Sequence, residues 1–280
     1  MSNLLKPSLD WLLIFVPITV LLEWTRPDNH IAIFACACLA ILPLAGWLGH
    51  ATEHLAARTG EAVGGLLNAT FGNAAELIIA FMALQKGLYP VVKASLTGSI
   101  IGNILLVFGA SCFAGGLKHR TQRFSAAGAR SQATLMMLSV VAVTVPDTFH
   151  YLVIGSLSKD QALLRDHDLS TEISIVLLIC YGLSLLFSLH THKQLFSCAG
   201  DTEQTEDHHA AWSPLRSMAT LAGATALIAW MSEILVGSVE QAAHTLGMTS
   251  LFIGVVVVAI IGNAAEHSTA IMVALKNRMD

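Results

Sequence analysis

Long apolar stretches alternate with short polar segments along almost the whole chain. Most of the stretches approach the roughly 20 residues that an α-helix needs to cross the hydrocarbon core of a bilayer. They lack the residue-by-residue alternation of transmembrane β-strands. The pattern therefore predicts an all-α, polytopic membrane protein with about eight spanning helices, near residues 11–24, 30–49, 62–84, 89–115, 132–155, 171–190, 214–237 and 250–275.

The composition excludes several classes of protein. Of the 280 residues, 54% are hydrophobic and 12% are charged, whereas a soluble domain carries roughly twice that share of charge. An ordinary water-soluble enzyme is therefore a poor match. The net charge of −4 provides no basic surface for nucleic acid. The five cysteines show neither a disulfide framework nor a metal-binding spacing, and we expect no resident cofactor.

The longest polar segment divides the chain. We predict a first half over residues 1–190, an acidic cytoplasmic loop over 191–213, and a partial second half over 214–280. A cytoplasmic N-terminus would place ten of the 15 lysine and arginine residues on the inner side. This excess follows the positive-inside rule and predicts that orientation.

One short motif occurs twice. Gly72–Glu76 (GNAAE) recurs unchanged as Gly262–Glu266, 190 residues later. The copies fall in the third and eighth predicted spans, so they would cross the membrane in opposite directions. Inverted repeats that meet at a midplane binding site are typical of secondary transporters. The alternative, two glycine-containing packing helices, explains the glycine and alanine residues but not the asparagine and glutamate.

The polar residues of the motif are suited to a hard cation. A glutamate within an apolar span is costly unless it is paired or functional. Asn73 precedes Glu76 by three residues and shares its helical face, and the second copy repeats this spacing. Carboxylate, amide and backbone oxygens are the ligands that Ca²⁺ prefers. The predicted cation- and proton-binding residues are Glu76, Glu266, Asn73, Asn263, Gly72 and Gly262, with the two glutamates as the Ca²⁺ ligands.

Two neighbouring carboxylates also predict coupling to protons. In a low-dielectric site they cannot both stay ionised without a cation, so the site would hold either a divalent cation or protons. Alternating access to such a site produces cation/proton exchange. Ser95, Ser99 and Asn103 recur every four residues on the fourth predicted span. They could line a pathway beside the site, or they could serve interhelical packing and hydrogen bonding.

The stretch Gly64–Phe71 and the motif that follows it, together with the second copy, resemble the Ca²⁺/H⁺ antiporter family of the cation/Ca²⁺ exchanger superfamily. Ser232–Glu240 also resembles family sequence before the second repeat. The resemblance implies two pseudo-symmetric halves joined by an acidic loop. It also implies export of cytosolic Ca²⁺ in return for protons, with the ion-binding glutamates at Glu76 and Glu266. The short N-terminus favours a bacterial inner membrane.

Family members continue for three more spans after the second repeat, so we expect an inverted-repeat exchanger fold that lacks its last three helices. The expected partners are membrane lipid, Ca²⁺ and protons. A transport-inactive fragment, or a half-transporter that needs a second copy or another chain, is an alternative. The segment His50–His54 matches the H-x-x-E-H pattern of zinc proteases, a remote alternative. A further hypothesis is that the histidines and the acidic cluster of the loop sense pH or Ca²⁺, against the plainer reading of a solvated connection; they are His190, His192, His208, His209 and residues 201–207.

Overall fold

The computed structural model describes residues 9–59, 61–153, 159–192 and 212–277, and every regular element within them is a helix. Five helical runs among these residues are long and apolar enough to cross a membrane. The number rises to seven if each of two bent helix pairs forms one span. The all-α, polytopic class is therefore confirmed, whereas a total of about eight spans stays a prediction.

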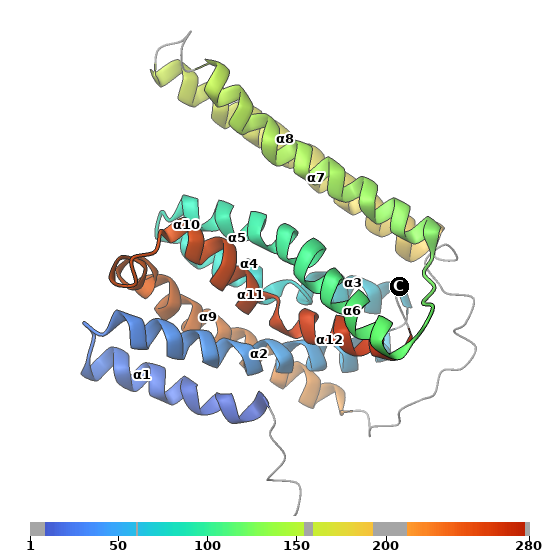
Figure 1. Ribbon diagram of the computed structural model, residues 1–280, viewed down its shortest axis with the longest axis horizontal. Coiled ribbons are helices and arrows are strands. Elements are labelled where there is room, and N and C mark those ends of the chain that lie inside the picture. The colour runs from blue at the N-terminus through green and yellow to red at the C-terminus, as the bar shows by residue number, and fades with distance from the viewer. Residues whose placement is uncertain (1–8, 60, 154–158, 193–211, 278–280) are drawn as a thin grey trace, which may run out of the picture. The chain divides into compact units, whose positions relative to one another are not determined.

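The chain forms two compact units, of which the first contains both copies of the motif. For the most part, its helices run roughly from left to right across the view of Figure 1. They are η1 (Leu9–Ile14), α1 (Phe15–Thr25), α2 (His30–Thr59), α3 (Glu61–Phe71), α4 (Ala74–Gln85), α5 (Tyr89–Ile101), η2 (Gly102–Val107), α6 (Phe108–Lys118), α9 (Pro214–Thr245), α10 (Ser250–Phe252), η5 (Ile253–Val258), α11 (Ala259–Gly262) and α12 (Ala264–Leu275). The elements η2 and η5 are π-helical segments.

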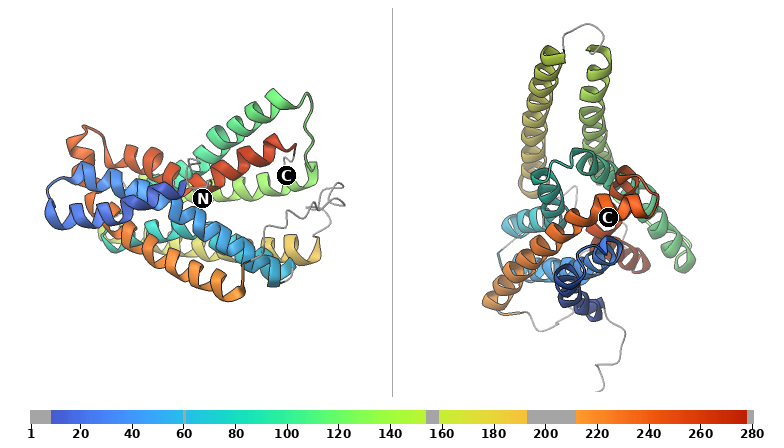
Figure 2. Two further views of the ribbon diagram at one scale, coloured as in Figure 1. Left: turned by 90° about the horizontal axis from the view of Figure 1, so that it is seen from below. Right: turned by 90° about the vertical axis from the view of Figure 1, so that its left-hand side faces the viewer.

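The second unit contains α7 (Ala126–Val153), α8 (Lys159–Leu186) and the π-helical segment η3 (Phe187–Thr191). Helices α7 and α8 run side by side as a long pair (Figure 2). Each compact unit is a set of helices that contact one another more than they contact the rest of the chain. The halves predicted from the longest polar segment, 1–190 and 214–280 about the loop 191–213, stay a prediction.

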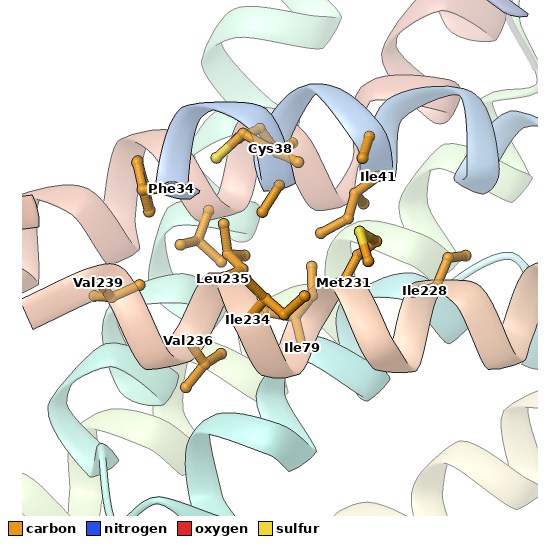
Figure 3. Close-up of a cluster of buried hydrophobic side chains, with 14 of the residues drawn as sticks. Phe34, Cys38, Ile41, Ile79, Ile228, Met231, Ile234, Leu235, Val236 and Val239 are labelled. Carbon is orange, nitrogen blue, oxygen red and sulfur yellow. The ribbon is translucent and has the colours of Figure 1, made fainter. Parts of the chain in front are cut away.

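The core of the first unit lies between α2 and α9, which share the most extensive helix interface. Phe34, Cys38 and Ile41 on α2 are buried against side chains of α9 that include Met231 and Leu235 (Figure 3). In lipid, helices associate through close van der Waals packing rather than through the hydrophobic effect. The fully buried small residues of α2 permit this close approach. They include Ala37 and Ala40.

Two of the helices break at the repeated motif. Helix α3 ends at Phe71, and α4 begins at Ala74 with a bend of 44°. The helical run up to Gly262 is bent by 61° from the run that follows it. Glycine weakens a helix, and the asparagine after it is the N-cap residue of the next helix. Its carbonyl accepts the first helical hydrogen bond, from Leu77 to Asn73 (3.0 Å) and from His267 to Asn263 (2.9 Å).

Several helices extend beyond the apolar stretches that predicted them. The stretch 30–49 belongs to α2, which continues to Thr59, and 214–237 belongs to α9, which continues to Thr245. Hydropathy detects the part of a helix that lies in lipid. Backbone hydrogen bonding does not stop there and continues into the polar layer.

Candidate functional site

Glu76 is the centre of a hydrogen-bond network that joins three segments. It lies half-buried in the first turn of α4, and the Ser99 hydroxyl on α5 donates to its Oε1 atom (2.8 Å). The Asn263 amide donates to the same oxygen and to Ser99 Oγ (3.0 Å). Asn263 is 2% exposed and also donates to the Ala259 carbonyl (3.0 Å). The network thus connects the first motif, the fourth predicted span and the second motif.

Two glycines bring α5 close enough to build this network. A Cβ added at Gly98 would lie 2.1 Å from the Val255 carbonyl oxygen, so the backbones of α5 and η5 touch there. A Cβ at Gly254 would lie 2.8 Å from Ala94 Cβ. Small residues at such crossings are the usual means of close helix packing in membranes. Ser99, which follows Gly98, therefore reaches the start of α12.

The glycine of each motif also faces the glutamate of the other. A Cβ at Gly262 would lie 3.0 Å from Glu76 Cγ, and a Cβ at Gly72 would lie 3.9 Å from Glu266 Oε1. The two motifs, 190 residues apart, therefore meet in space. Glutamates in the first turns of two half-helices also lie at positive helix ends, which stabilise negative charge.

The two copies differ in how far they are enclosed. Both asparagines donate to the carbonyl four residues earlier, Asn73 to Ala69 (3.3 Å) and Asn263 to Ala259 (3.0 Å). Asn73 is nevertheless exposed, whereas Asn263 is buried against α5. Glu266 is also more exposed than Glu76. Protein atoms therefore enclose Glu76 more fully than Glu266.

The groups that the site offers to a metal ion are oxygen atoms. Within the described residues, no group of three or more histidine, cysteine, aspartate or glutamate side chains could hold a metal ion. A cation between the motifs would instead use two carboxylates together with hydroxyl, amide or backbone oxygens. This set suits a hard cation that is bound and released.

Among the three predicted pathway residues, the structure brings Ser99 into the network. Ser95 is half-buried on α5, and Asn103 is exposed in η2. Sequence reasoning did not identify His267, which lines a cavity of about 160 Å³ together with Ser99 and Asn263. Its position four residues after Asn263, on the same helical face, was the available signal.

Within the part of the chain that the structure describes, the side chains of the H-x-x-E-H segment do not form a group of three that could hold a metal ion. His50 Nδ1 lies 3.6 Å from Glu53 Oε2, and both side chains are exposed. The His54 ring stacks on Trp212, with 4.9 Å between the ring centroids. In the proposed sensor loop, His192 stacks on Phe187 at 4.2 Å. His190 is exposed in η3. The other loop residues of that hypothesis, His208, His209 and 201–207, lie outside the described residues.

The fold and the site together define an α-helical integral membrane protein whose polar centre is formed where two helices break within the apolar layer. Residues 29–190 and 216–280 match the sodium/calcium exchanger protein family. The chain belongs to this family.

Three relatives extend the comparison. A Ca²⁺/H⁺ antiporter of Aphanothece halophytica is 43% identical over 280 residues, which are 96% of this chain and 74% of that protein. The Ca²⁺/H⁺ antiporter ChaA of Bacillus subtilis is 42% identical, over 95% of this chain and 73% of that protein. The solved structure of native YfkE superposes with a TM-score of 0.77 at 37% identity, over 98% of this chain and 74% of that one.

Proposed function

We propose that this protein is a secondary active transporter that exchanges Ca²⁺ for protons at a site formed by Glu76 and Glu266. The observation that carries the proposal is the meeting of the two motifs, in which each glutamate lies against the glycine of the other copy. The names of the relatives, which are Ca²⁺/H⁺ antiporters, support the choice of ions. They also argue against the protease alternative.

Binding of Ca²⁺ would use the two carboxylates as the charged ligands. In the present arrangement the Asn263 amide and the Ser99 hydroxyl donate hydrogen bonds to Glu76. A cation would take over the interaction with the carboxylate oxygen. Both donors also carry acceptor oxygens, so a rotation of either group turns it from a donor to Glu76 into a ligand of the ion.

Proton coupling follows from the same two carboxylates. Once Ca²⁺ leaves, the glutamates at the junction of the motifs repel one another if both remain ionised. Protonation removes this repulsion, so protons and Ca²⁺ compete for one site. Alternating access, with the half-helices exposing the site first to one side and then to the other, converts competition into exchange.

The orientation and location belong to this proposal. The distribution of lysine and arginine favours a cytoplasmic N-terminus, and bacterial relatives favour the bacterial inner (plasma) membrane. Ca²⁺ would then leave the cytosol as protons enter. Competition of Mn²⁺ and Mg²⁺ with Ca²⁺ during uptake would measure selectivity among ions that all take oxygen ligands.

The test is Ca²⁺ uptake into inverted membrane vesicles, driven by a pH gradient. We expect Glu76→Gln and Glu266→Gln each to abolish uptake, because each removes a charged ligand. Glu240→Gln, at an exposed position on α9, is the matched control and should transport normally. Normal uptake by either of the first two variants would exclude the two-glutamate site.

A half-transporter that acts with a second chain is the other candidate, and the unequal enclosure of the two copies favours it. Asn263 and Glu76 are covered by α5, whereas Asn73 and Glu266 are exposed. A helix from another copy or polypeptide could cover them as α5 covers the first pair. Uptake by the purified chain, reconstituted at no more than one copy per vesicle, would exclude this candidate. Uptake only after co-expression with the remaining C-terminal part of a relative would support it.

A further inference from the structure

The last turn of α12 is capped by side chains from another part of the chain. Gln122 Nε2 donates to the Ala274 carbonyl (2.8 Å), and His119 Nε2 lies 3.0 Å from the Leu275 carbonyl. A carbonyl oxygen can only accept, so His119 Nε2 carries the hydrogen. The last four carbonyls of an α-helix have no partner within it. His119, which follows α6, therefore supplies one of these missing donors, to Leu275. Gln122 adds a second donor to the Ala274 carbonyl, which also accepts from the Asn277 N–H (3.0 Å).

Helix α6 is shaped to hold this cap. A Cβ at Gly115 would lie 2.1 Å from Gln122 Oε1, so the Gln122 amide occupies the space that a larger residue would fill. At the neighbouring Gly116, no described atom outside the local chain lies within 4 Å of an added Cβ. Both His119 and Gln122 are half-buried, which limits competition from water for these hydrogen bonds.

The cap matters because α12 is a short half-helix with Glu266 in its first turn. The N-terminal end of α12 follows the break beside Asn263, so the preceding helix does not fix its direction. Contacts at the C-terminal end of α12 therefore contribute to its position. A helix of this length is rigid along its axis, and Glu266 is about 14 Å from the cap at 1.5 Å per residue. The other half-helix, α4, is attached differently, through its own Lys86 ammonium, which donates to the Glu233 carbonyl on α9 (3.1 Å).

We propose that His119 and Gln122 are positioning residues for the cation site, which hold the end of α12 and so keep Glu266 against Gly72. This inference rests on the proposed function of the site. Both the neutral Nε2–H form and the imidazolium form of His119 can donate, so the cap persists in either state. It acts through the position of α12 and requires no contact of His119 or Gln122 with the transported ion.

The experiment compares variants that lose the cap by independent routes. Gln122→Met and His119→Leu remove the donors, while Gly115→Ala displaces Gln122 without altering it. Each should raise the KM for Ca²⁺ by about fivefold, the effect of one lost hydrogen bond, with a smaller change in maximal rate. His119→Gln, which keeps a donor, should restore the KM, and Gly116→Ala should leave it unchanged. An unchanged KM in Gln122→Met and Gly115→Ala, or an equal effect of Gly116→Ala, would overturn the inference.

A second measurement separates this inference from the proposed function. Carbodiimide labelling of Glu266 and Glu76 in the purified protein, followed by mass spectrometry, measures how accessible each carboxyl group is. This measurement does not require transport activity. Gln122→Met should accelerate labelling of Glu266 relative to Glu76. If the wild type does not transport Ca²⁺ but labelling shifts in this way, the proposed function fails and the positioning role stands. If the wild type transports and labelling is unchanged, the positioning role fails.

Discussion

Gly262 provides the space in which Glu76 lies: a Cβ at Gly262 would come within 3.0 Å of the Cγ atom of Glu76. The glycine of this motif therefore does more than weaken a helix. It admits the carboxylate-bearing side chain of the other copy. Gly72 also faces the glutamate of the other copy, at the ordinary contact distance of 3.9 Å between an added Cβ and Glu266 Oε1. The repeated glycine and the repeated glutamate thus form complementary pairs between the copies.

Replacing Gly262 should disturb this pair directly. In Gly262→Ala the new methyl group would press on Glu76, and overpacking of this kind costs about 1–3 kcal/mol. We expect pH-driven Ca²⁺ uptake to fall by roughly tenfold, since about 1.4 kcal/mol corresponds to a factor of ten. Gly102→Ala is the control, because no described atom beyond the local chain lies within 4 Å of a Cβ there. Wild-type uptake by Gly262→Ala would contradict the close pairing.

Ser99 should contribute to Ca²⁺ affinity through Glu76. Ser99→Ala removes the hydroxyl that donates to Glu76 Oε1 and accepts from Asn263. A single hydrogen bond contributes about 0.5–1.5 kcal/mol, so the KM for Ca²⁺ should rise by roughly two- to tenfold. Thr97→Ala is a matched control, since the Thr97 hydroxyl donates to the Lys93 carbonyl of its own helix (2.9 Å). An equal KM in the two variants would show that the Ser99 hydroxyl does not contribute to Ca²⁺ affinity.

The two motif asparagines should differ in their effect on stability. Asn263→Ala removes one donor each from Glu76, Ser99 and the Ala259 carbonyl, and each lost hydrogen bond costs about 0.5–1.5 kcal/mol. Asn73→Ala alters an exposed side chain and should change the melting temperature much less. Thermal unfolding of both variants in the same detergent compares them. A similar loss in the two would show that the unequal enclosure has no energetic consequence.

The α2–α9 interface should depend on close packing at Met231. Its side chain is 0% exposed, whereas Met218 on the same helix is 57% exposed. Met231→Ala leaves a cavity between the helices, and such truncations cost about 2–5 kcal/mol. We expect a clear fall in melting temperature for Met231→Ala and little change for Met218→Ala. Equal melting temperatures of the two variants would show that packing at Met231 does not stabilise the α2–α9 interface.

Much of the architecture could be predicted from the order of apolar and polar residues. Where the structure describes them, the predicted spans lie on helical residues except at the breaks in the two motifs, because a backbone in lipid must satisfy its own hydrogen bonds. The breaks at Gly72 and Gly262 were foreseeable as weak points of a helix, but their bends of 44° and 61° were not. Those angles depend on the helices packed around each break.

The sequence by itself determined the all-α membrane class, the identity of the two motifs and the choice of Glu76 and Glu266 as candidates, because lipid makes every intramembrane charge conspicuous. Only the tertiary structure decided that Ser99, rather than Ser95 or Asn103, enters the network of Glu76. It also decided that Gly262 faces Glu76 and that Gln122 caps α12. These relations join residues of different helices, and they depend on interhelical approach distances that spacing along one helix does not specify.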